Sequence, residues 1–482
     1  MKLIAALVAA LCVAFNAHAA ALPPAVKQAL KQAGIPQSAI GIVVQQTGGR
    51  KPLISLNARQ AMNPASTMKL LTTYAGLDLL GPAYTWKTEA WLDGELKDGV
   101  LHGDLVLKGY GDPKFTIEQF WLWLAELRAR GLREIHGNLV LDRSFFDLPP
   151  HDPAAFDNDP VRAYNVGPDA LLLNFNTLRL RYLPDGDKLN VITEPPLDGI
   201  RLDNRLIPEP AGSCDGWDDR VIVQPGGDSV VLQGGYPGEC GEREHNLSVM
   251  PHPRYMEAVF RALWKELGGT LNGELREGTA KDDAKLFSTH HSDPLSTIIR
   301  DINKFSNNVM ARQLFLTLGA TAFTHSPLAG EGGGDGAKKE ATFTNVERSV
   351  LAAQDWLHRQ RLDFPELVLE NGAGLSRTER ISAQHLAQLL QSAATHPFSA
   401  EFEASLPILG VDGSVKKRLK ESPSAGHAHL KTGTLEGVKT IAGYVRSRNG
   451  REWVVVFFIS HPHAKYGQDA QDALVQWIQQ RR

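Results

Sequence analysis

The sequence predicts an α+β protein in which an antiparallel sheet flanked by helices is interrupted by a nested, β-rich insertion. Three observations support this prediction. The chain opens with a helix and two strands after its first segment, it ends with strands and a helix, and the long stretch between carries short strands punctuated by Gly, Pro and Asp. With 482 residues, of which 43% are hydrophobic and 22% charged, the chain can bury several cores, so we expect two or three domains.

The first segment is typical of a secretory signal peptide, which we place at residues 1–19. Lys2 precedes the apolar run Leu3–Phe15, and Ala17-His18-Ala19 forms a small-x-small cleavage pattern. The alternative is a single membrane anchor, but an anchor needs about 20 apolar residues and this run is shorter. No other segment could span a bilayer, so we expect a periplasmic protein with no integral membrane span after signal removal.

The charge balance argues against two classes of partner. The formal net charge is −3, and cleavage of the signal removes only Lys2, which leaves about −4 on the mature chain. A protein that neutralises phosphates needs a basic excess, so we expect no nucleic-acid partner and no polybasic membrane surface.

The cysteine content predicts one disulfide. Cys12 leaves with the signal, and the mature chain keeps only Cys214 and Cys240. An even pair in an exported protein favours a bond between them, although two free buried thiols are the alternative. Two cysteines alone cannot build a zinc site.

The two ends of the chain carry the elements of one sheet. The N-terminal part predicts a helix over Pro24–Gly34, a strand over Ala39–Gln46 and a hairpin partner over Pro52–Leu56. The C-terminal part predicts a strand around Leu430, then the strands Val438–Arg446 and Trp453–Ile459 joined through Arg448-Asn449-Gly450, and a last helix over Asp469–Gln480. The two ends together can therefore form an antiparallel sheet covered by helices.

The middle of the chain, from about Trp86 to Leu286, reads as the insertion. Strand-like runs such as Leu105–Lys108 and Gly137–Leu141 alternate with turn residues, and helices are expected over Glu118–Leu132 and Arg254–Leu267. A separate Gly-rich stretch, Leu328–Lys339, has no apolar periodicity and predicts a mobile surface loop without chemistry.

Ser66 and Lys69 are the first candidates for catalysis. Asn63 suits a helix N-cap and Pro64 the first helical position, and an apolar helix follows to Leu80. Ser66 then lies in the first turn, and Lys69 lies on the same face three residues later. A lysine that is desolvated or near another cation can be neutral and can take the serine proton, while free N–H groups at the helix start can stabilise an oxyanion.

Ser-x-x-Lys alone is weak evidence, because a second copy occurs at Ser414-Val415-Lys416-Lys417. No long apolar helix follows that copy, so we interpret it as a solvated turn or short helix. For Ser66 the plain alternative is a helix-start serine beside a surface lysine.

Ser306-Asn307-Asn308 lies between two amphipathic helices, one with Leu295, Ile298, Ile299 and Ile302 and one with Met310, Leu314 and Leu318. Helix capping is one explanation of these polar residues. The functional explanation is a hydroxyl relay at Ser306 and an amide at Asn308 that orients substrate.

The third motif is Lys431-Thr432-Gly433-Thr434, ahead of the C-terminal hairpin. Lys431 supplies what we interpret as a permanent positive charge, Thr432 adds a hydroxyl, and Gly433 lets a ligand backbone approach the strand. Such an edge can bind an extended peptide. The alternative is an exposed edge strand protected by its lysine.

These three motifs in this order resemble those of penicillin-recognising serine acyltransferases. The chain is similar to the low-molecular-mass penicillin-binding proteins with D-alanyl-D-alanine carboxypeptidase and endopeptidase activity, the DacB-like group. Further segments look like signatures of this family. They are Gly109–Pro113, Tyr164–Pro168, Asn174–Asn176, Gly372–Arg377 and Leu406–Gly410. Ala373 departs from the family, whose members often have Ser there.

The resemblance implies nested domains. The transpeptidase-like catalytic domain would comprise residues 20–89 and 286–482, a first inserted domain residues 90–165 and 250–285, and a second inserted domain residues 166–249. This division agrees with the 240 positions between Ser66 and Ser306.

The resemblance also implies a mechanism without cofactor or metal. Ser66 attacks the D-Ala-D-Ala carbonyl and Lys69 accepts its proton. Ser306 and Lys431 pass a proton to the leaving amine. Asn308 holds the acyl-side amide, Lys431 and Thr432 hold the terminal carboxylate, Gly433 completes the substrate-binding motif, and the N–H groups of Ser66 and Thr434 hold the oxyanion. Peptidoglycan peptides and β-lactam antibiotics are therefore the expected partners.

Two other functions stay open at this point. A serine β-lactamase would share the acylation but release penicillin quickly, and a non-catalytic wall-binding or β-lactam-sensing protein would keep only the pocket. The sequence has no His-Glu-x-x-His and no Gly-x-Ser-x-Gly motif, and we place His461-Pro462-His463 in a loop after a strand rather than at a metal.

Overall fold

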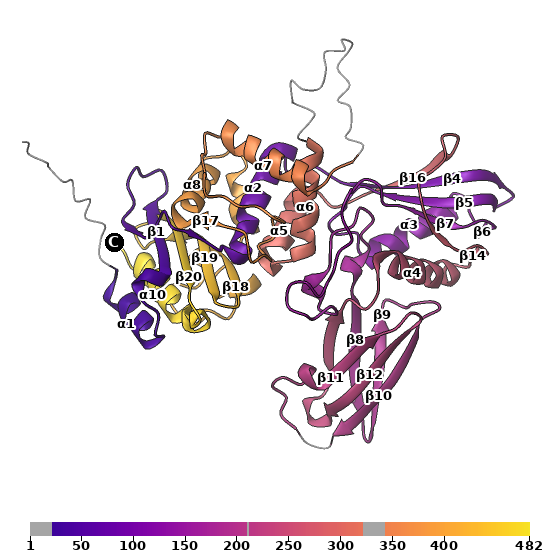
Figure 1. The fold of residues 1–482 in the computed structure, drawn as a ribbon, viewed down its shortest axis with the longest axis horizontal. Coiled ribbons are helices and arrows are strands. Elements are labelled where there is room, and N and C mark those ends of the chain that lie inside the picture. The colour runs from indigo at the N-terminus through magenta and orange to yellow at the C-terminus, as the bar shows by residue number, and fades with distance from the viewer. Residues whose placement is uncertain (1–21, 210–211, 322–342) are drawn as a thin grey trace, which may run out of the picture.

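The computed structural model describes residues 22–209, 212–321 and 343–482. The predicted signal peptide and the Gly-rich stretch Leu328–Lys339 lie outside the described residues. The helices and strands form three bodies, one around a five-stranded sheet and two that the insertion supplies (Figure 1).

The five-stranded sheet unites the two ends of the chain, as the sequence predicts. Its order is β18-β19-β20-β1-β2, and every neighbouring pair is antiparallel. The strands are β18 (Ala428–Leu435), β19 (Val438–Arg446), β20 (Glu452–Ser460), β1 (Ile40–Gln46) and β2 (Ile54–Leu56). β18 is the last strand in this order, and on its outer side only an isolated bridge joins His429 to Ile408, so β18 is an edge strand.

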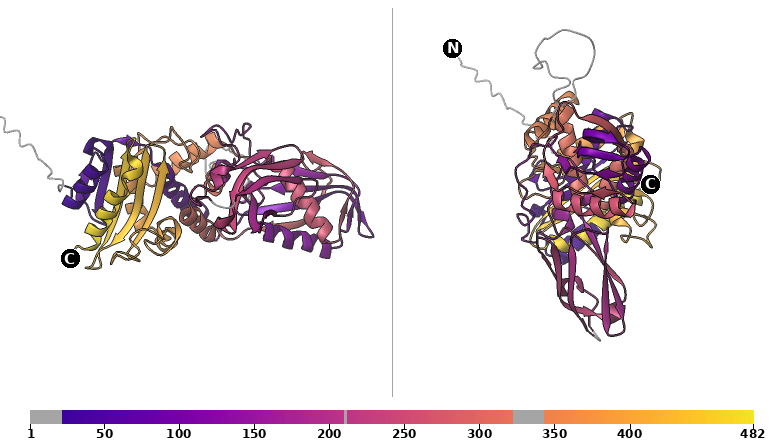
Figure 2. Two further views of the ribbon diagram at one scale, coloured as in Figure 1. Left: turned by 90° about the horizontal axis from the view of Figure 1, so that it is seen from below. Right: turned by 90° about the vertical axis from the view of Figure 1, so that its right-hand side faces the viewer.

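Helices cover both faces of this sheet (Figure 2). Successive residues of a strand point to opposite faces, and in β20 Val454 and Val456 join one core while Val455 and Phe457 join the other. One face packs against α1 (Pro24–Gln32) and α10 (Gln468–Gln479). The other face packs against α2 (Lys69–Leu80), α5 (Leu295–Phe305), α6 (Asn308–Thr321), α7 (Val346–Arg359), α8 (Ala383–Ala394) and α9 (Ser399–Ser405).

The first inserted body is a seven-stranded sheet with α3 (Ile117–Ala129) and α4 (His252–Glu266) packed on it. The two ends of the insertion lie side by side, because β4, its first strand, pairs antiparallel with β16, its last strand. The paired strands reach Lys87 and His291, a few residues beyond the expected bounds of the insertion. The strands are β4 (Lys87–Lys97), β5 (Val100–Gly109), β6 (Glu134–Ile135), β7 (Leu139–Asp142), β14 (Thr270–Leu271), β15 (Leu275–Glu277) and β16 (Lys285–His291).

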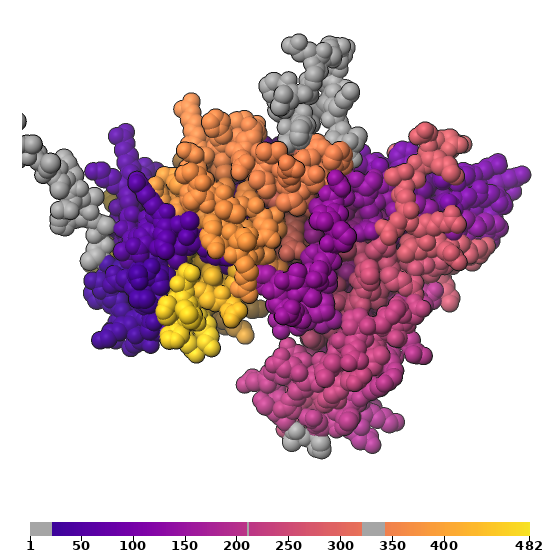
Figure 3. All heavy atoms as spheres, viewed as in Figure 1, coloured from indigo at the N-terminus to yellow at the C-terminus, as the bar shows by residue number. Residues whose placement is uncertain are grey.

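The second inserted body consists of two three-stranded sheets that share one core. It projects away from the other two bodies (Figure 3). One sheet has the order β13 (Arg243–Leu247), β8 (Leu178–Asp185), β9 (Lys188–Glu194), and the other has the order β10 (Arg201–Glu209), β12 (Ser229–Pro237), β11 (Val221–Pro225).

Cys214 and Cys240 are bonded within this second body, which confirms the predicted disulfide. The Cα atoms lie 5.4 Å apart, a separation that a disulfide spans without backbone movement. No helix in the described ranges is long and apolar enough to cross a membrane.

Replacing both Cys214 and Cys240 by Ser should destabilise this body, because the bond closes a loop between positions 26 residues apart. The expected loss in unfolding free energy is about 3 to 4 kcal/mol, to be measured by denaturant unfolding. Native protein should contain no alkylatable thiol in these positions, and two reactive thiols in non-reduced material would contradict the assignment.

Candidate active site

Ser66 lies in a short 3-10 turn, η2 (Ala65–Met68), directly ahead of α2. This turn runs directly into α2, so Ser66 lies in the opening turn as expected, but with 3-10 rather than α-helical geometry. Ala65 has a left-handed backbone, with a φ of 46°, which interrupts the helical path between Pro64 and Ser66. Asn63 Oδ1 accepts a hydrogen bond from the Ala65 N–H at 2.8 Å, but Pro64 is the N-cap residue of η2 and no side chain caps this turn. The predicted N-cap at Asn63 and first helical position at Pro64 are therefore each one residue too early.

Two glycines allow neighbouring segments to pack against this turn. A Cβ on Gly433 of β18 would lie 2.8 Å from the Ser66 nitrogen, and a Cβ on Gly374 would lie 1.9 Å from the Ala65 carbonyl oxygen. Both separations are too short for a real side chain. From the sequence we expected the missing side chain of Gly433 to leave room for the backbone of a ligand. In the structure the backbone of the Ser66 turn occupies that space.

Lys69 is completely buried at 0% exposure and has three close partners. Its Nζ lies 3.1 Å from Ser66 Oγ, 2.7 Å from Asn308 Oδ1 and 2.5 Å from the Ala373 carbonyl oxygen. Burial lowers the pKa of Lys69 well below its ordinary value, and the nearby Lys431 lowers it further, whereas Glu379 acts in the opposite direction. Burial and the neighbouring Lys431 therefore both favour the neutral form of the amine.

The Ser306–Asn308 link joins α5 to α6, as predicted. Ser306 has a left-handed backbone with a φ of 58° and ends α5. The two asparagines of the link have different roles. Asn307 caps the following helix, because its Oδ1 accepts a hydrogen bond from the Met310 N–H. The Asn308 side chain instead forms part of the site, because its Oδ1 accepts a hydrogen bond from Lys69 Nζ. Asn308 Nδ2 also donates to the Tyr164 carbonyl at 3.1 Å.

Lys431 lies on the edge strand β18, but its side chain is not exposed. It is buried at 0% exposure, and its Nζ donates to Ser306 Oγ and to the Thr432 carbonyl, both at 2.8 Å. Burial lowers the pKa of Lys431 to about 7. The interpretation of Lys431 as a permanent charge on an open edge is therefore wrong, because the side chain points inward to the Ser306 link.

Thr432 and Thr434 follow on the same strand. Thr434 is exposed, and Thr432 Oγ1 lies 2.8 Å from Ser414 Oγ. Ser414 belongs to the second Ser-x-x-Lys copy, which forms the short turn η7 (Gly413–Val415), as expected. The Lys417 side chain of this copy is exposed and makes no hydrogen bond to Ser414 in the described structure.

Sequence reasoning missed the backbone and buried groups that hold the site together. The carbonyl of Ala373 meets Lys69 in a loop where the family often has a Ser hydroxyl. Glu379, also buried at 0% exposure, accepts the N–H groups of Glu370, Asn371 and Gly372 and so shapes this loop. The only hint of the bond between Lys69 and the Ala373 carbonyl in the sequence was the family resemblance of Gly372–Arg377. That resemblance does not show where a backbone carbonyl points.

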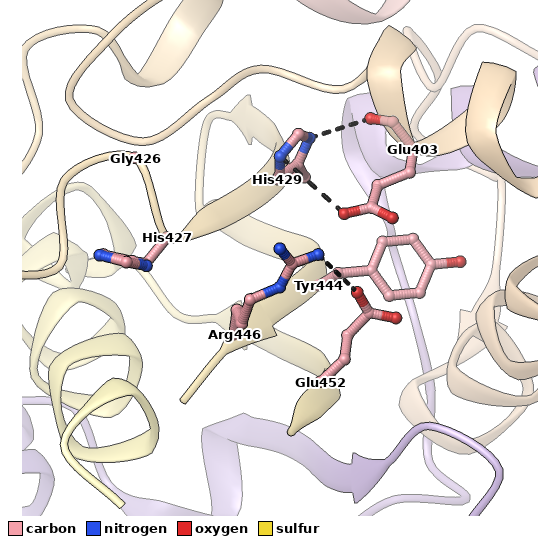
Figure 4. A pocket seen from close by; sticks show the side chains of 7 residues that line it. All are labelled: Glu403, Gly426, His427, His429, Tyr444, Arg446 and Glu452. Carbon is pink, nitrogen blue, oxygen red and sulfur yellow. Dashed lines mark hydrogen bonds and ion pairs between the residues drawn. The ribbon is translucent and has the colours of Figure 1, made fainter. Parts of the chain in front are cut away.

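The structure has one cavity beside the Ser306–Asn308 link and another at the start of β18. One has a volume of about 490 Å³ and is bordered by Ser306 and Asn308. The other, of about 50 Å³, lies at the start of the strand beside His429 (Figure 4). In that second cavity His429 Nδ1 donates to the Glu403 carbonyl at 3.1 Å, and Arg446 pairs with Glu452 at 3.8 Å, so much of its polar lining is already satisfied by the protein.

No cluster of three or more His, Cys, Asp or Glu side chains that could hold a metal ion occurs in the part of the chain that the structure describes. His461 and His463 lie in the loop after β20, which ends at Ser460. This placement agrees with the loop that the sequence predicts.

The fold and the three motifs together define a penicillin-recognising serine peptidase. Over residues 22–481 the chain matches the D-Ala-D-Ala carboxypeptidase 3 (S13) family, and it belongs to that family. The family resemblance in the sequence is thereby confirmed.

Characterised relatives agree with this assignment. A D-alanyl-D-alanine carboxypeptidase of Actinomadura sp. (strain R39) is 28% identical over 427 residues, which cover 85% of this chain and 76% of the relative. The carboxypeptidase DacB of Haemophilus influenzae is 25% identical and covers 88% of this chain and 85% of its own. The crystal structure of penicillin binding protein 4 from H. influenzae has the same fold, with a TM-score of 0.75, 22% identity, and coverage of 94% and 99% of the two chains.

Substituting Gly433 or Gly374 by Ala should displace the Ser66 turn and lower the rate of acylation by penicillin by at least about tenfold, since either added Cβ meets backbone. Gly227→Ala is the matched control, because nothing lies within 4 Å of its Cβ position. Stopped-flow acylation rates test this expectation. Parental rates in both site variants would contradict the packing argument.

Lys431→Met should change the pH dependence of stability. An unfolded lysine titrates near 10.4 and the folded one near 7, so between these values the unfolded chain binds more protons and the unfolding free energy rises with pH. Below about pH 7 the folded protein carries a buried charge, and the neutral side chain should stabilise it there.

Denaturant unfolding of the parent and of Lys431→Met at about pH 6 and about pH 9 checks this sign. The difference between the two pH values should be smaller in the variant, with a remainder from Lys69. An unchanged pH dependence would show that Lys431 keeps an ordinary pKa in the folded protein.

Proposed function

We propose that this protein is a serine D-alanyl-D-alanine carboxypeptidase and endopeptidase that cleaves peptidoglycan stem peptides and cross-links through an acyl-enzyme on Ser66. The observation that carries the proposal is the arrangement around the Lys69 amine. In its neutral form Nζ has two hydrogens and one lone pair. The hydrogens fit the Asn308 and Ala373 oxygens at 2.7 and 2.5 Å, which leaves the lone pair for the Ser66 hydroxyl.

In the acylation step Ser66 Oγ bonds to the D-Ala-D-Ala carbonyl carbon, and its proton passes to Lys69 Nζ. The N–H groups of Ser66 and Thr434 stabilise the oxyanion. The C–N bond then breaks, and the leaving amine takes a proton through Ser306, whose Oγ is bonded to Lys431 Nζ. This proton comes from the Lys431 ammonium, so Lys431 is neutral in the acyl-enzyme. Water then adds to the acyl carbon as one of its protons passes through Ser306 back to Lys431. When the ester C–O bond breaks, Ser66 Oγ regains its proton from Lys69 Nζ and the free acid leaves.

The remaining motif residues hold the substrate. Asn308 Nδ2 has a second hydrogen beyond the one given to Tyr164, and this hydrogen can bind the acyl-side amide. Lys431 and Thr432 bind the terminal carboxylate. A substrate carboxylate beside Lys431 raises the pKa of this amine, so that its ammonium form accompanies the bound peptide.

The comparisons support this proposal. The relatives are named as D-alanyl-D-alanine carboxypeptidases, and the H. influenzae protein of the same fold has been crystallised with a β-lactam. We therefore also propose that β-lactams acylate Ser66, that residues 1–19 direct the chain to the periplasm, and that residues 90–165 with 250–285, and 166–249, are two nested domains.

Labelled penicillin should attach covalently to Ser66, because only this Ser-x-x-Lys places a buried lysine against the serine. Ser66→Ala should abolish labelling and the release of D-Ala from a peptide that ends in D-Ala-D-Ala. Ser414→Ala is the matched control and should still be labelled. Intact-mass analysis followed by peptide mapping gives the attachment site.

Three results would contradict the proposal. An adduct on Ser414 would move the nucleophile. Rapid nitrocefin turnover without D-Ala release would indicate a β-lactamase, and labelling with neither nitrocefin turnover nor D-Ala release would indicate a β-lactam-sensing protein.

A further inference from the structure

A groove of about 490 Å³ continues from the Ser306–Asn308 link toward the inserted bodies. On one side it is bordered by the link itself and by Phe305, a residue that is 70% exposed. Its volume falls within the range of about 300 to 1,000 Å³ that is typical of drug-sized ligands. The groove is therefore larger than the two terminal residues of a stem peptide require.

The opposite wall is a row of polar side chains across three adjacent strands. Asn246 of β13 is paired with Arg179 of β8, and Arg179 is paired with Glu194 of β9. Their neighbours Leu178, Leu180 and Leu247 point to the other side and form the core of this body. The row thus lies on the outer face of the sheet, where it borders the groove.

A strained turn connects this wall to the catalytic link. Asn174, Phe175 and Asn176 have φ values of 45°, 57° and 50°, in the left-handed region that residues other than glycine rarely adopt. Side-chain bonds hold the turn: Asn174 Nδ2 donates to Tyr255 Oη, and Asn176 Nδ2 donates to the Met250 carbonyl. Phe175 packs against Val309 beside Asn308.

The charges of the groove favour a peptide over a sugar chain. Glu118 at the start of α3 borders it, and the Glu118 side chain makes no hydrogen bond or ion pair within the described ranges. Arg179 pairs with Glu194 at 3.5 Å and with Glu244 at 3.9 Å, and Glu194 also pairs with Arg181 at 3.3 Å. All of these side chains are reachable from solvent. Ionised groups of both signs complement the ammonium and carboxylate groups of a peptide, whereas a glycan chain without ionised groups cannot pair with them.

We propose that this groove binds the second peptide strand of a cross-linked peptidoglycan dimer, so that Asn246, Arg179, Glu194 and Glu118 select cross-linked substrates. The proposal rests on the function proposed above, since the scissile bond must lie at Ser66. The proposal adds a second binding site to the protein, and residues of the insertion form it. This site holds the peptide of the dimer that does not become attached to Ser66.

To test the proposal, a bulky side chain is introduced into the groove at a position that does not contact Ser66 or its catalytic partners. Asn246 is exposed and its side chain has no hydrogen bond in the described structure, so Asn246→Trp fills space without removing a contact. Asn190→Trp is the matched control, because Asn190 is exposed on the same sheet, nearer the β8–β9 turn, and does not border the groove.

Asn246→Trp should lower kcat/KM for a cross-linked muropeptide dimer by about tenfold or more. Its acylation by penicillin and its release of D-Ala from a short peptide should stay within about twofold of the parent. In a Ser66→Ala background, calorimetry should show weaker dimer binding when Asn246→Trp is added. The control should equal the parent in all of these measurements.

Several outcomes would overturn the groove proposal. These are parental dimer cleavage by Asn246→Trp, failure of an otherwise active parent to cleave dimers, or an equal loss in Asn190→Trp. A loss of the same size on an uncross-linked disaccharide pentapeptide would assign the groove to the glycan instead. Failure of the proposed function looks different, because the parent itself would then neither be acylated by penicillin nor release D-Ala from the short peptide.

Discussion

The candidate site depends on one buried amine. Lys69 is enclosed by the Ser66 turn, the Asn308 side chain and the Ala373 carbonyl, and desolvation makes the charged form costly. Each of these partners comes from a different part of the chain, so the surroundings that lower the pKa of Lys69 exist only in the assembled fold. A local change in any of the three would alter both the hydrogen bonds of the amine and the burial that lowers its pKa.

The insertion is part of this assembly rather than an appendage to it. Asn308 donates to the Tyr164 carbonyl, which sets the amide so that its oxygen faces Lys69. Further along α6, Gln313 bonds to the backbone of Asp169, and Arg312 bonds to the Val166 carbonyl. A chain without residues 90–285 would retain every catalytic side chain but would lose the groups that orient Asn308 and hold α6.

Glycine positions explain why the three motifs can meet. The Ser66 turn lies between Gly374 and Gly433, and any side chain at either position would meet its backbone. The site therefore needs the missing side chains at Gly374 and Gly433 as well as its hydroxyl and amine groups, because any side chain there would displace the Ser66 turn. Glu379 fixes the loop that contains Gly374 through three backbone N–H groups, so a buried carboxylate supports the site without contacting the serine.

The sequence by itself determined the five-stranded sheet, its helices, the β-rich insertion, the disulfide and the three motifs, because strand alternation, helical periodicity and motif spacing are local properties. Only the tertiary structure decided that Ser66 lies in a 3-10 turn, that Lys431 is buried, and that the Tyr164 and Ala373 carbonyls complete the site. Burial and backbone partners depend on segments hundreds of positions apart. A motif shows which side chains are present, but the packing around them sets their charge and their direction.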